Sequence, residues 1–215
     1  MTHIKRINGI GLDYFPGDTL VFAGLTYGVV LAKDGRLWLD RNLGATQVAT
    51  AYNDAAAYGD LYQWGRYCDR HQVRTSPTSA TRIAYTTTGN GNFITCVDSP
   101  YDWADPQSDL PWQGLNGPNN PGPVGFRLPT QAEWAALVAA ENITNIATGY
   151  SSSLKLTYAQ QRNSETAAIQ DVGRYWSSTV DGIYSHGLNF DDGIVSTAAM
   201  YSRALGLAVR PIKDY

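Results

Sequence analysis

Hydrophobic and polar residues near the N-terminus form two short apolar runs with a turn between them. Residues 29–31 are apolar, Asp34 and Gly35 follow, and residues 37–39 are apolar again. Asp-Gly favours a tight hairpin turn, because glycine accepts a positive φ without steric cost. The pattern therefore predicts a β-hairpin over residues 28–39.

A first helix is predicted over residues 53–67. Ala57, Leu61 and Trp64 recur there at helical spacing, so that one face of the helix would be apolar. Gly59 lies inside this stretch and lowers its helix propensity, because glycine loses the most backbone freedom on folding. We nevertheless expect a helix, since the apolar spacing extends over the whole stretch.

The strongest helix signal covers residues 130–141. Thr130 is a good N-cap, and Glu133 three residues later completes a capping box. Trp134 and Leu137 then begin an apolar face. A helix that buries this face is therefore predicted.

The C-terminal part is typical of strands. Residues 175–179 are aromatic or small, and residues 188–190 and 207–210 place large apolar side chains at alternate positions. Residues 142–171 have no clear pattern, and the Gly/Pro/Asn-rich residues 114–125 predict a long ordered loop, with a domain boundary as the alternative. The element order predicts one α+β domain over residues 1–215, in which the N-terminal hairpin and the C-terminal strands share a sheet.

Charge and hydropathy exclude several classes of partner. Charged residues make up 16% of the chain, the net charge is -3, and no run of Lys or Arg occurs, so nucleic acid is not expected as a partner. No apolar stretch is long enough to span a bilayer, so membrane insertion is not expected. The first 15 residues have a basic start without an apolar stretch and do not predict a signal peptide, so display on a cell or virus surface would need another route.

The sequence contains few candidate catalytic residues. His3, His71 and His186 have no metal-ligand spacing, no serine lies in a Gly-x-Ser-x-Gly elbow, and no phosphate-binding loop occurs. We therefore predict no enzyme activity, no cofactor and no catalytic metal. Four carboxylates leave a loop-bound Ca²⁺ open, although turn capping explains them as well; they are Asp98, Asp102, Asp105 and Asp109.

Aromatic residues are abundant, with 6 Trp and 14 Tyr. Core filling is the ordinary role for such residues, and we expect it for Trp38, Trp64, Trp134 and Trp176. Tyr184 and Tyr201 lie instead in a segment of weak periodicity with small polar neighbours. Tyrosine offers a large contact area at low entropy cost, as in binding loops, so these two are candidate ligand contacts.

Five motifs carry a resemblance to a known family: GRLWLDRNLGA (residues 35–45), YGDLYQWGR (58–66), GFRLPTQAEW (125–134), RYWSSTV (174–180) and LAVRPIKD (207–214). Together they resemble the variable proteins targeted by diversity-generating retroelements, and more broadly the bacterial surface domains related to formylglycine-generating enzyme. The third motif alone marks only the broad superfamily. The resemblance covers the chain from about residue 28 onward and implies a C-type-lectin-like fold with two helices around small antiparallel sheets and long ordered loops.

The same resemblance implies a non-catalytic binding protein whose surface is diversified over about residues 176–210. In such proteins, error-prone reverse transcription randomises adenines of a template repeat. Randomised Asn codons cannot yield Lys, Glu, Gln, Met or Trp, and residues 181–205 contain none of these except Met200. The ligands are expected to be proteins; their identity and the oligomeric state of the chain are left open.

The resemblance divides this region into scaffold and variable positions. The scaffold positions are Trp176, Ser177, Ser178, Leu188, Phe190, Arg203, Gly206, Val209 and Arg210. The variable, ligand-binding positions are Asp181, Ile183, Tyr184, His186, Asp191, Asp192, Ile194, Ser196, Ala198, Ala199, Tyr201, Ser202 and Leu205. Alternating apolar anchors fix a backbone while the intervening side chains point outward, so we expect the variable set to be exposed and contiguous.

Departures from related families define the alternatives. Gly122 and Pro211 stand where relatives often have cysteines, so their disulfide is not expected, and a bridge between Cys68 and Cys96 is left open. No cysteine follows Cys96, whereas formylglycine-generating enzymes use reactive cysteines near the C-terminus. The calcium and sugar ligand motifs of sugar-binding lectins are also missing. An undiversified adhesin or carbohydrate-binding domain of the same fold is the main alternative, and a formylglycine-generating-type oxidoreductase is the lesser one.

Overall fold

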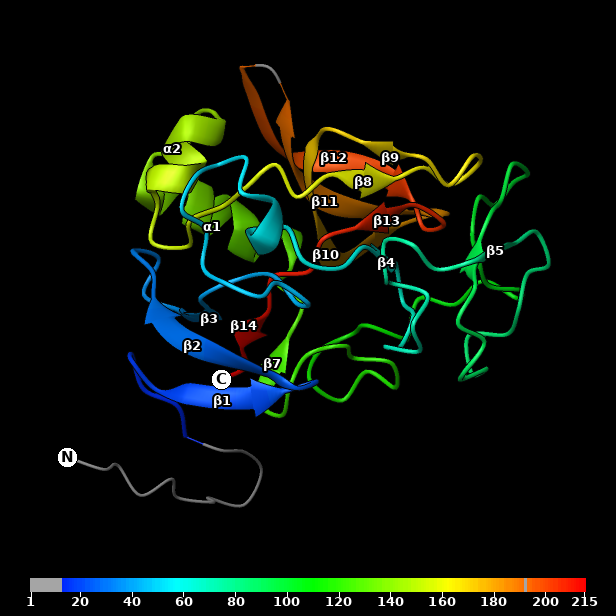
Figure 1. Ribbon diagram of the computed structural model, residues 1–215, viewed down its shortest axis with the longest axis horizontal. Coiled ribbons are helices and arrows are strands. Elements are labelled where there is room, and N and C mark those ends of the chain that lie inside the picture. Colours follow the sequence, from blue (N-terminus) through cyan, green and yellow to red (C-terminus); the bar gives the residue numbers. More distant parts are fainter. Residues whose placement is uncertain (1–12, 192) are drawn as a thin grey trace.

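The computed structural model describes residues 13–191 and 193–215, which form a mixed α+β structure with mostly antiparallel sheets (Figure 1). Its helices are α1 (Gln131–Glu141), α2 (Ile146–Ser151) and the 3₁₀ turn η1 (Ala55–Ala57). Its strands are β1 (Thr19–Phe22), β2 (Leu25–Leu31), β3 (Leu37–Leu39), β4 (Tyr62–Gln63), β5 (Thr78–Ser79), β6 (Phe93–Ile94), β7 (Phe126–Arg127), β8 (Gln161–Arg162), β9 (Ile169–Gln170), β10 (Gly173–Asp181), β11 (Tyr184–Asp191), β12 (Ile194–Ser202), β13 (Gly206–Leu207) and β14 (Ile212–Lys213).

A five-stranded sheet in the order β1-β2-β3-β14-β7 contains the predicted hairpin. Val30 of β2 pairs with Trp38 of β3, and Gly35 takes a φ of +78° in the turn between them. Ile212 of β14 pairs with Trp38 on its other side. The hairpin is therefore confirmed, and the sheet shared by both ends of the chain is confirmed for β14, whereas the other C-terminal strands lie elsewhere.

The C-terminal hairpins form a separate antiparallel sheet in the order β10-β11-β12. Figure 1 shows this sheet in the upper part of the molecule, with α1 and α2 beside it and the five-stranded sheet below. A third sheet has the order β4-β13-β8-β9, and β5 and β6 form a small parallel pair. An isolated bridge between Tyr175 and Ala208 joins β10 to the segment that follows β13.

The sheet of β10–β12 lies between two hydrophobic clusters. Tyr175 and Trp176 are neighbours on β10, so their side chains point to opposite faces of the sheet. Tyr175 packs in the cluster that contains Trp134 of α1 and Leu188 of β11. Trp176 packs in the other cluster, which contains Trp64 and side chains of the five-stranded sheet. The sheet is thus held from both sides along β10.

Helix α1 begins as its sequence predicts. The Oγ1 of Thr130 accepts a hydrogen bond from the backbone N–H of Glu133, and the Glu133 carboxylate accepts one from the N–H of Thr130 at 2.8 Å. Trp134 and Leu137 are fully buried on the face that packs against the sheet. The helix ends at Asn142, which takes a left-handed conformation with a φ of +53°.

The helix predicted over residues 53–67 is wrong. Only the three residues of η1 are helical, and β4 follows directly. Gly59 has a φ of +73°, and a Cβ built on it would lie 2.3 Å from the carbonyl oxygen of Leu43. Gly65 has a φ of +79° as well. Because an α-helix requires a negative φ throughout, these glycines end the helix that the apolar spacing favours.

Motifs that are distant in the sequence meet at the start of α1. Arg127 donates two hydrogen bonds of 2.8 Å to the carboxylate of Glu133 and one of 2.6 Å to Asp214. Burial alone would raise the pKa of Glu133, but the hydrogen bonds from Arg127 and the N-cap outweigh it and lower this pKa to about 2. The GFRLPTQAEW and LAVRPIKD motifs therefore join at a charged cluster that fixes β7, α1 and β14 together.

Candidate functional site

Three tryptophan N–H groups fix the base of β10. The indole Nε1 of Trp176 donates to the carbonyl of Tyr62 at 2.7 Å, and that of Trp134 donates to the carbonyl of Trp176 at 3.1 Å. Trp64 donates in the same way to the carbonyl of Ser177 at 2.9 Å. These three indoles are at most 1% exposed, so each N–H is satisfied within the core. The RYWSSTV motif thus anchors the sheet.

The positions that the resemblance assigns to the scaffold are all buried, and these are Trp176, Ser177, Ser178, Leu188, Phe190, Arg203, Gly206, Val209 and Arg210. Each buried aliphatic or aromatic side chain stabilises the fold by roughly 1.5–3 kcal/mol. Substitution at these positions would therefore destabilise the whole sheet, which makes them suitable as constant positions.

Arg203 holds the turn between β10 and β11 although it lies after β12. Its side chain is fully buried, and its guanidinium carbon lies 4.6 Å from the centre of a Trp64 ring. The guanidinium donates to the carbonyls of Gly182 and Ser108 at 3.0 Å and to the carboxylate of Asp109 at 2.6 Å. A buried cation that is paired and stacked in this way fixes the backbone of the turn independently of the turn's own side chains.

Residues around this turn form a contiguous exposed group, which we call the turn patch. Asp181, Tyr184 and Ser202 are aligned across the three strands, and His186 is aligned with Met200 on the same face. The Nε2 of His186 lies 3.9 Å from a carboxylate oxygen of Asp181. Asp181 and Met200 are exposed and the other three are half-buried. Met200, which departs from the expected codon pattern, therefore belongs to this surface.

The outer side of β12 forms the second part of the surface, which we call the β12 edge (residues 194–200). Ile194 is 61% exposed and Met200 is 53% exposed. Ala198 is exposed and Ser196 is half-buried between them. Ala199 is half-buried because it packs against the cluster that contains Trp176.

Tyr201 does not belong to the exposed surface that the sequence predicts. It is only 8% exposed, and its hydroxyl donates a hydrogen bond of 3.0 Å to the side-chain oxygen of Asn189. Its ring meets that of Trp176 edge-on and lies 4.9 Å from the guanidinium of Arg174. A Cβ on Gly187 would lie 3.0 Å from this ring, so the missing side chain there makes room for it. Tyr201 is therefore a core residue.

The remaining predicted positions divide by exposure. Asp181, Ile194 and Ala198 are exposed, and the half-buried positions are Ile183, Tyr184, His186, Ser196, Ala199, Ser202 and Leu205. The side chain of Asp191 and the whole of Asp192 lie outside the described residues. Of the ten described positions three are therefore exposed and seven are half-buried, so the expectation of an exposed set holds only in part. Most of the ten lie in the turn patch and along β12.

His71 is paired with a carboxylate, as catalytic histidines often are, but its ring is not accessible to a substrate. Its Nδ1 lies 2.6 Å from the carboxylate of Asp69, which also accepts hydrogen bonds from Arg66. Its Nε2 accepts the backbone N–H of Gln63 at 3.1 Å, so the ring nitrogen that would act as a base is occupied. The ring is fully buried, and burial lowers the pKa of His71 to about 4. This neutral histidine has a structural role.

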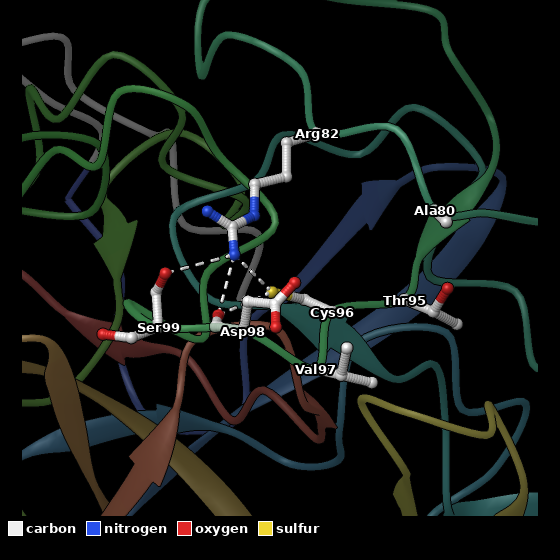
Figure 2. A pocket seen from close by; sticks show the side chains of 7 residues that line it. All are labelled: Ala80, Arg82, Thr95, Cys96, Val97, Asp98 and Ser99. Carbon is white, nitrogen blue, oxygen red and sulfur yellow. Dashed lines mark hydrogen bonds between the residues drawn. The ribbon is translucent and has the colours of Figure 1, made fainter.

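A hollow of about 400 Å³ lies beside Cys96 and Arg82 (Figure 2). One guanidinium nitrogen of Arg82 donates to the carbonyl of Asp98 at 2.7 Å and lies 3.0 Å from the sulfur of Cys96. These bonds clamp the loop that follows Cys96. Both Cys68 and Cys96 are free thiols, so the disulfide that the sequence left open is not formed.

Two of the four carboxylates considered for Ca²⁺ have protein partners. Asp102 is buried and accepts hydrogen bonds from the N–H of Ala104 and the side chain of Gln107, while Asp109 pairs with Arg203. Within residues 13–191 and 193–215, no group of three or more His, Cys, Asp or Glu side chains is arranged to hold a metal ion. The bond from Ala104 to Asp102 is the turn capping that the sequence left open as the alternative to a Ca²⁺ site.

Comparisons of the sequence with protein-family models and with curated proteins, and of the structure with solved structures, found no match. No helix in the described part of the chain has both the length and the apolarity to cross a membrane. The assignment of function therefore depends on the chemistry and geometry of the surface formed by the turn patch and the β12 edge.

Proposed function

We propose that this chain is a non-catalytic binding protein of C-type-lectin-like fold, and that a retroelement diversifies its turn patch and β12 edge to bind protein ligands. One observation carries the proposal. Within about thirty residues of chain, the scaffold positions are buried while most positions expected to vary are exposed or half-buried. Exposed substitutions change stability by about 0.5 kcal/mol or less, whereas core truncations cost about 2–5 kcal/mol. The exposed and half-buried positions are therefore expected to tolerate randomisation better than the buried ones.

The shape of this surface favours a protein ligand over a small molecule. Small-molecule sites are concave. Three hollows of about 390, 400 and 470 Å³ in the described part of the chain are lined by residues outside the turn patch and the β12 edge. An outward-facing group that combines Tyr184, His186 and Met200 offers aromatic and apolar contact area of the kind enriched in protein interfaces.

The DNA that flanks the coding sequence gives the most direct test. We expect a near-copy of the segment that encodes residues 175–210, which differs from it mainly at adenines and lies beside a reverse-transcriptase gene. Absence of such a copy would favour the undiversified adhesin or carbohydrate-binding domain, because that alternative needs no template.

A display experiment tests tolerance to diversification. We would randomise Asp181, Tyr184 and His186 together, and as a matched control Tyr175, Trp176 and Leu188. Because the first group is exposed or half-buried and the second is fully buried, most members of the first library should resist proteolysis and few of the second should. Equal survival of the two libraries would contradict the proposed division.

A further inference from the structure

We infer that the β12 edge takes up an extended segment of the protein ligand as an added strand, so that the constant main chain of β12 supplies binding and its varying side chains supply selectivity. This inference rests on the proposed function and deepens it. It specifies the chemistry of the partner: a segment in extended conformation with free backbone N–H and C=O groups.

The β12 edge lies at the border of its sheet. β11 is the only strand with which β12 pairs in the described part of the chain. Outside this ladder, the described residues form no backbone–backbone hydrogen bond with residues 194–200. An edge strand leaves alternate N–H and C=O groups without a sheet partner, and these groups can accept another strand.

The opposite border of the same sheet is closed. Trp176 of β10 donates its backbone N–H to the carbonyl of Ala208 at 3.0 Å, and Ala208 donates to the carbonyl of Arg174 at 3.3 Å. Further along β10, Ser178 donates its N–H to the carbonyl of Pro129 at 2.8 Å. Residues after β13 and before α1 thus occupy the border of β10, while the border of β12 has no such cover within residues 13–191 and 193–215.

β12 lacks most of the usual protection of a long edge. Natural edge strands are blunted by Lys, by Pro, by shortness or by bulges. The border strands of the five-stranded sheet are short, with four residues in β1 and two in β7. β12 has nine residues, with the sequence IVSTAAMYS, and contains no charged residue and no proline. The one protective feature of β12 is the register shift in its pairing with β11, between Gly187 and Asn189.

A strand partner suits a surface whose side chains change. Hydrogen bonds from main-chain groups do not depend on the side chains of either strand, so they persist when β12 is diversified. Side chains on alternate positions of β12 then select among ligand segments. The part of β12 whose border has no backbone partner ends before Ser202, whose hydroxyl donates a hydrogen bond to the carbonyl of Tyr101 at 2.7 Å. A ligand segment of about seven residues therefore fits between this contact and the β11–β12 turn.

A second copy of this chain is the competing occupant, and the structure favours the ligand segment. Pairing of two β12 strands would bury the exposed side chains of Ile194 and Met200 against each other. Each diversified variant would then alter its own association, and the varied side chains would no longer face a ligand. Sedimentation of the intact protein distinguishes the two occupants.

The test uses random-sequence peptides of about ten residues, displayed on phage and selected against the intact protein. A selected peptide is then synthesised with N-methyl groups on alternate residues, in both registers. We expect one register to weaken binding at least about tenfold and the other to change it less than about twofold, because only alternate N–H groups face β12. Hydrogen exchange should slow at alternate amides of residues 194–200 when the peptide binds.

Four results would overturn the inference: no peptide is selected, both registers behave alike, protection appears only outside β12, or the protein alone sediments as a dimer with protected β12 amides. The flanking DNA and the display libraries test the proposed function by independent measurements. A near-copy of the coding segment together with any of these four results would therefore reject strand addition while retaining the binding surface.

Discussion

Strands β11 and β12 are neighbours in one sheet, yet their side chains lie in opposite environments. Leu188 and Phe190 of β11 are fully buried, whereas Ile194 and Met200 of β12 are 61% and 53% exposed. The difference follows from position in the sheet, since β11 lies between β10 and β12. A strand at the centre is fixed by its neighbours on both sides, and a strand at the border can vary on its exposed positions. This contrast sets where the chain can tolerate change.

The largest expected effect comes from truncation of the central strand. Leu188→Ala should lower the free energy of unfolding by about 2–5 kcal/mol, because it removes buried contacts and leaves a cavity. Ile194→Ala on β12 should change it by about 0.5 kcal/mol or less. Chemical denaturation of both variants provides the measurement. Equal losses would show that β11 and β12 do not differ as their exposure indicates.

Acid should weaken the base of the sheet through His71. Its Nε2 accepts the N–H of Gln63, whose side chain in turn donates to the carbonyl of Ala204 just after β12. Burial lowers the folded-state pKa of His71 to about 4, below the ordinary value of 6.5. Protonation therefore favours the unfolded chain, so this contribution is complete above pH 6.5 and is lost as the pH falls towards 4.

The size of the acid effect is up to about 3 kcal/mol, from about 1.4 kcal/mol for each pKa unit. Denaturation midpoints measured between pH 7 and pH 4 should fall, and those of His71→Gln should fall less over the same range. Asp69 has a pKa of about 2, so its own titration lies below this window. A difference in midpoint between the wild type and His71→Gln that is constant from pH 7 to pH 4 would reject the buried neutral histidine, because Asp60, whose pKa burial raises to about 6, titrates in both proteins.

Helix α1 supports the sheet, and its N-cap should have a smaller effect. Thr130→Ala should lower the free energy of unfolding by about 1–2 kcal/mol, because the N–H of Glu133 loses its acceptor. The helix start also contacts β10, since Gln131 donates its N–H to the hydroxyl of Thr179. The denaturation midpoint should fall with little change in slope. Thr130→Ser, which keeps the hydroxyl, should restore most of the stability.

Local signals account for what could be predicted from the sequence. The capping box of Thr130 and Glu133 lies within four residues, and the turn at Asp34 and Gly35 lies within two, so neither depends on distant packing. The α+β class followed from the order of these elements. The buried scaffold positions followed from the family resemblance, and four of them, Trp176, Leu188, Phe190 and Val209, also from their apolar character.

Long-range packing explains what could not be predicted. Gly59 has a positive φ and the Leu43 carbonyl occupies the place of a side chain there, and no residue near Gly59 in the sequence indicates this contact. The orientation of Tyr201 depends on its pairing with Ser185 and on the register shift further along β12. Because a shift of one residue moves a side chain to the other face, a strand whose bulge is unknown cannot be assigned a face from its sequence.

The smallest and most selective prediction compares Tyr201 with Tyr184. Tyr201→Phe removes the hydrogen bond to Asn189 in the core and should lower the free energy of unfolding by about 1 kcal/mol. Tyr184→Phe, in the half-buried turn patch, should leave it nearly unchanged. The side-chain oxygen of Asn189 keeps a hydrogen bond of 3.1 Å from Arg174, which limits the loss at Tyr201. Thermal unfolding of both variants measures the difference. If Tyr184→Phe destabilised the protein as much as Tyr201→Phe, Tyr184 would belong to the core, and the turn patch would lose the aromatic side chain that makes it suitable for a protein ligand.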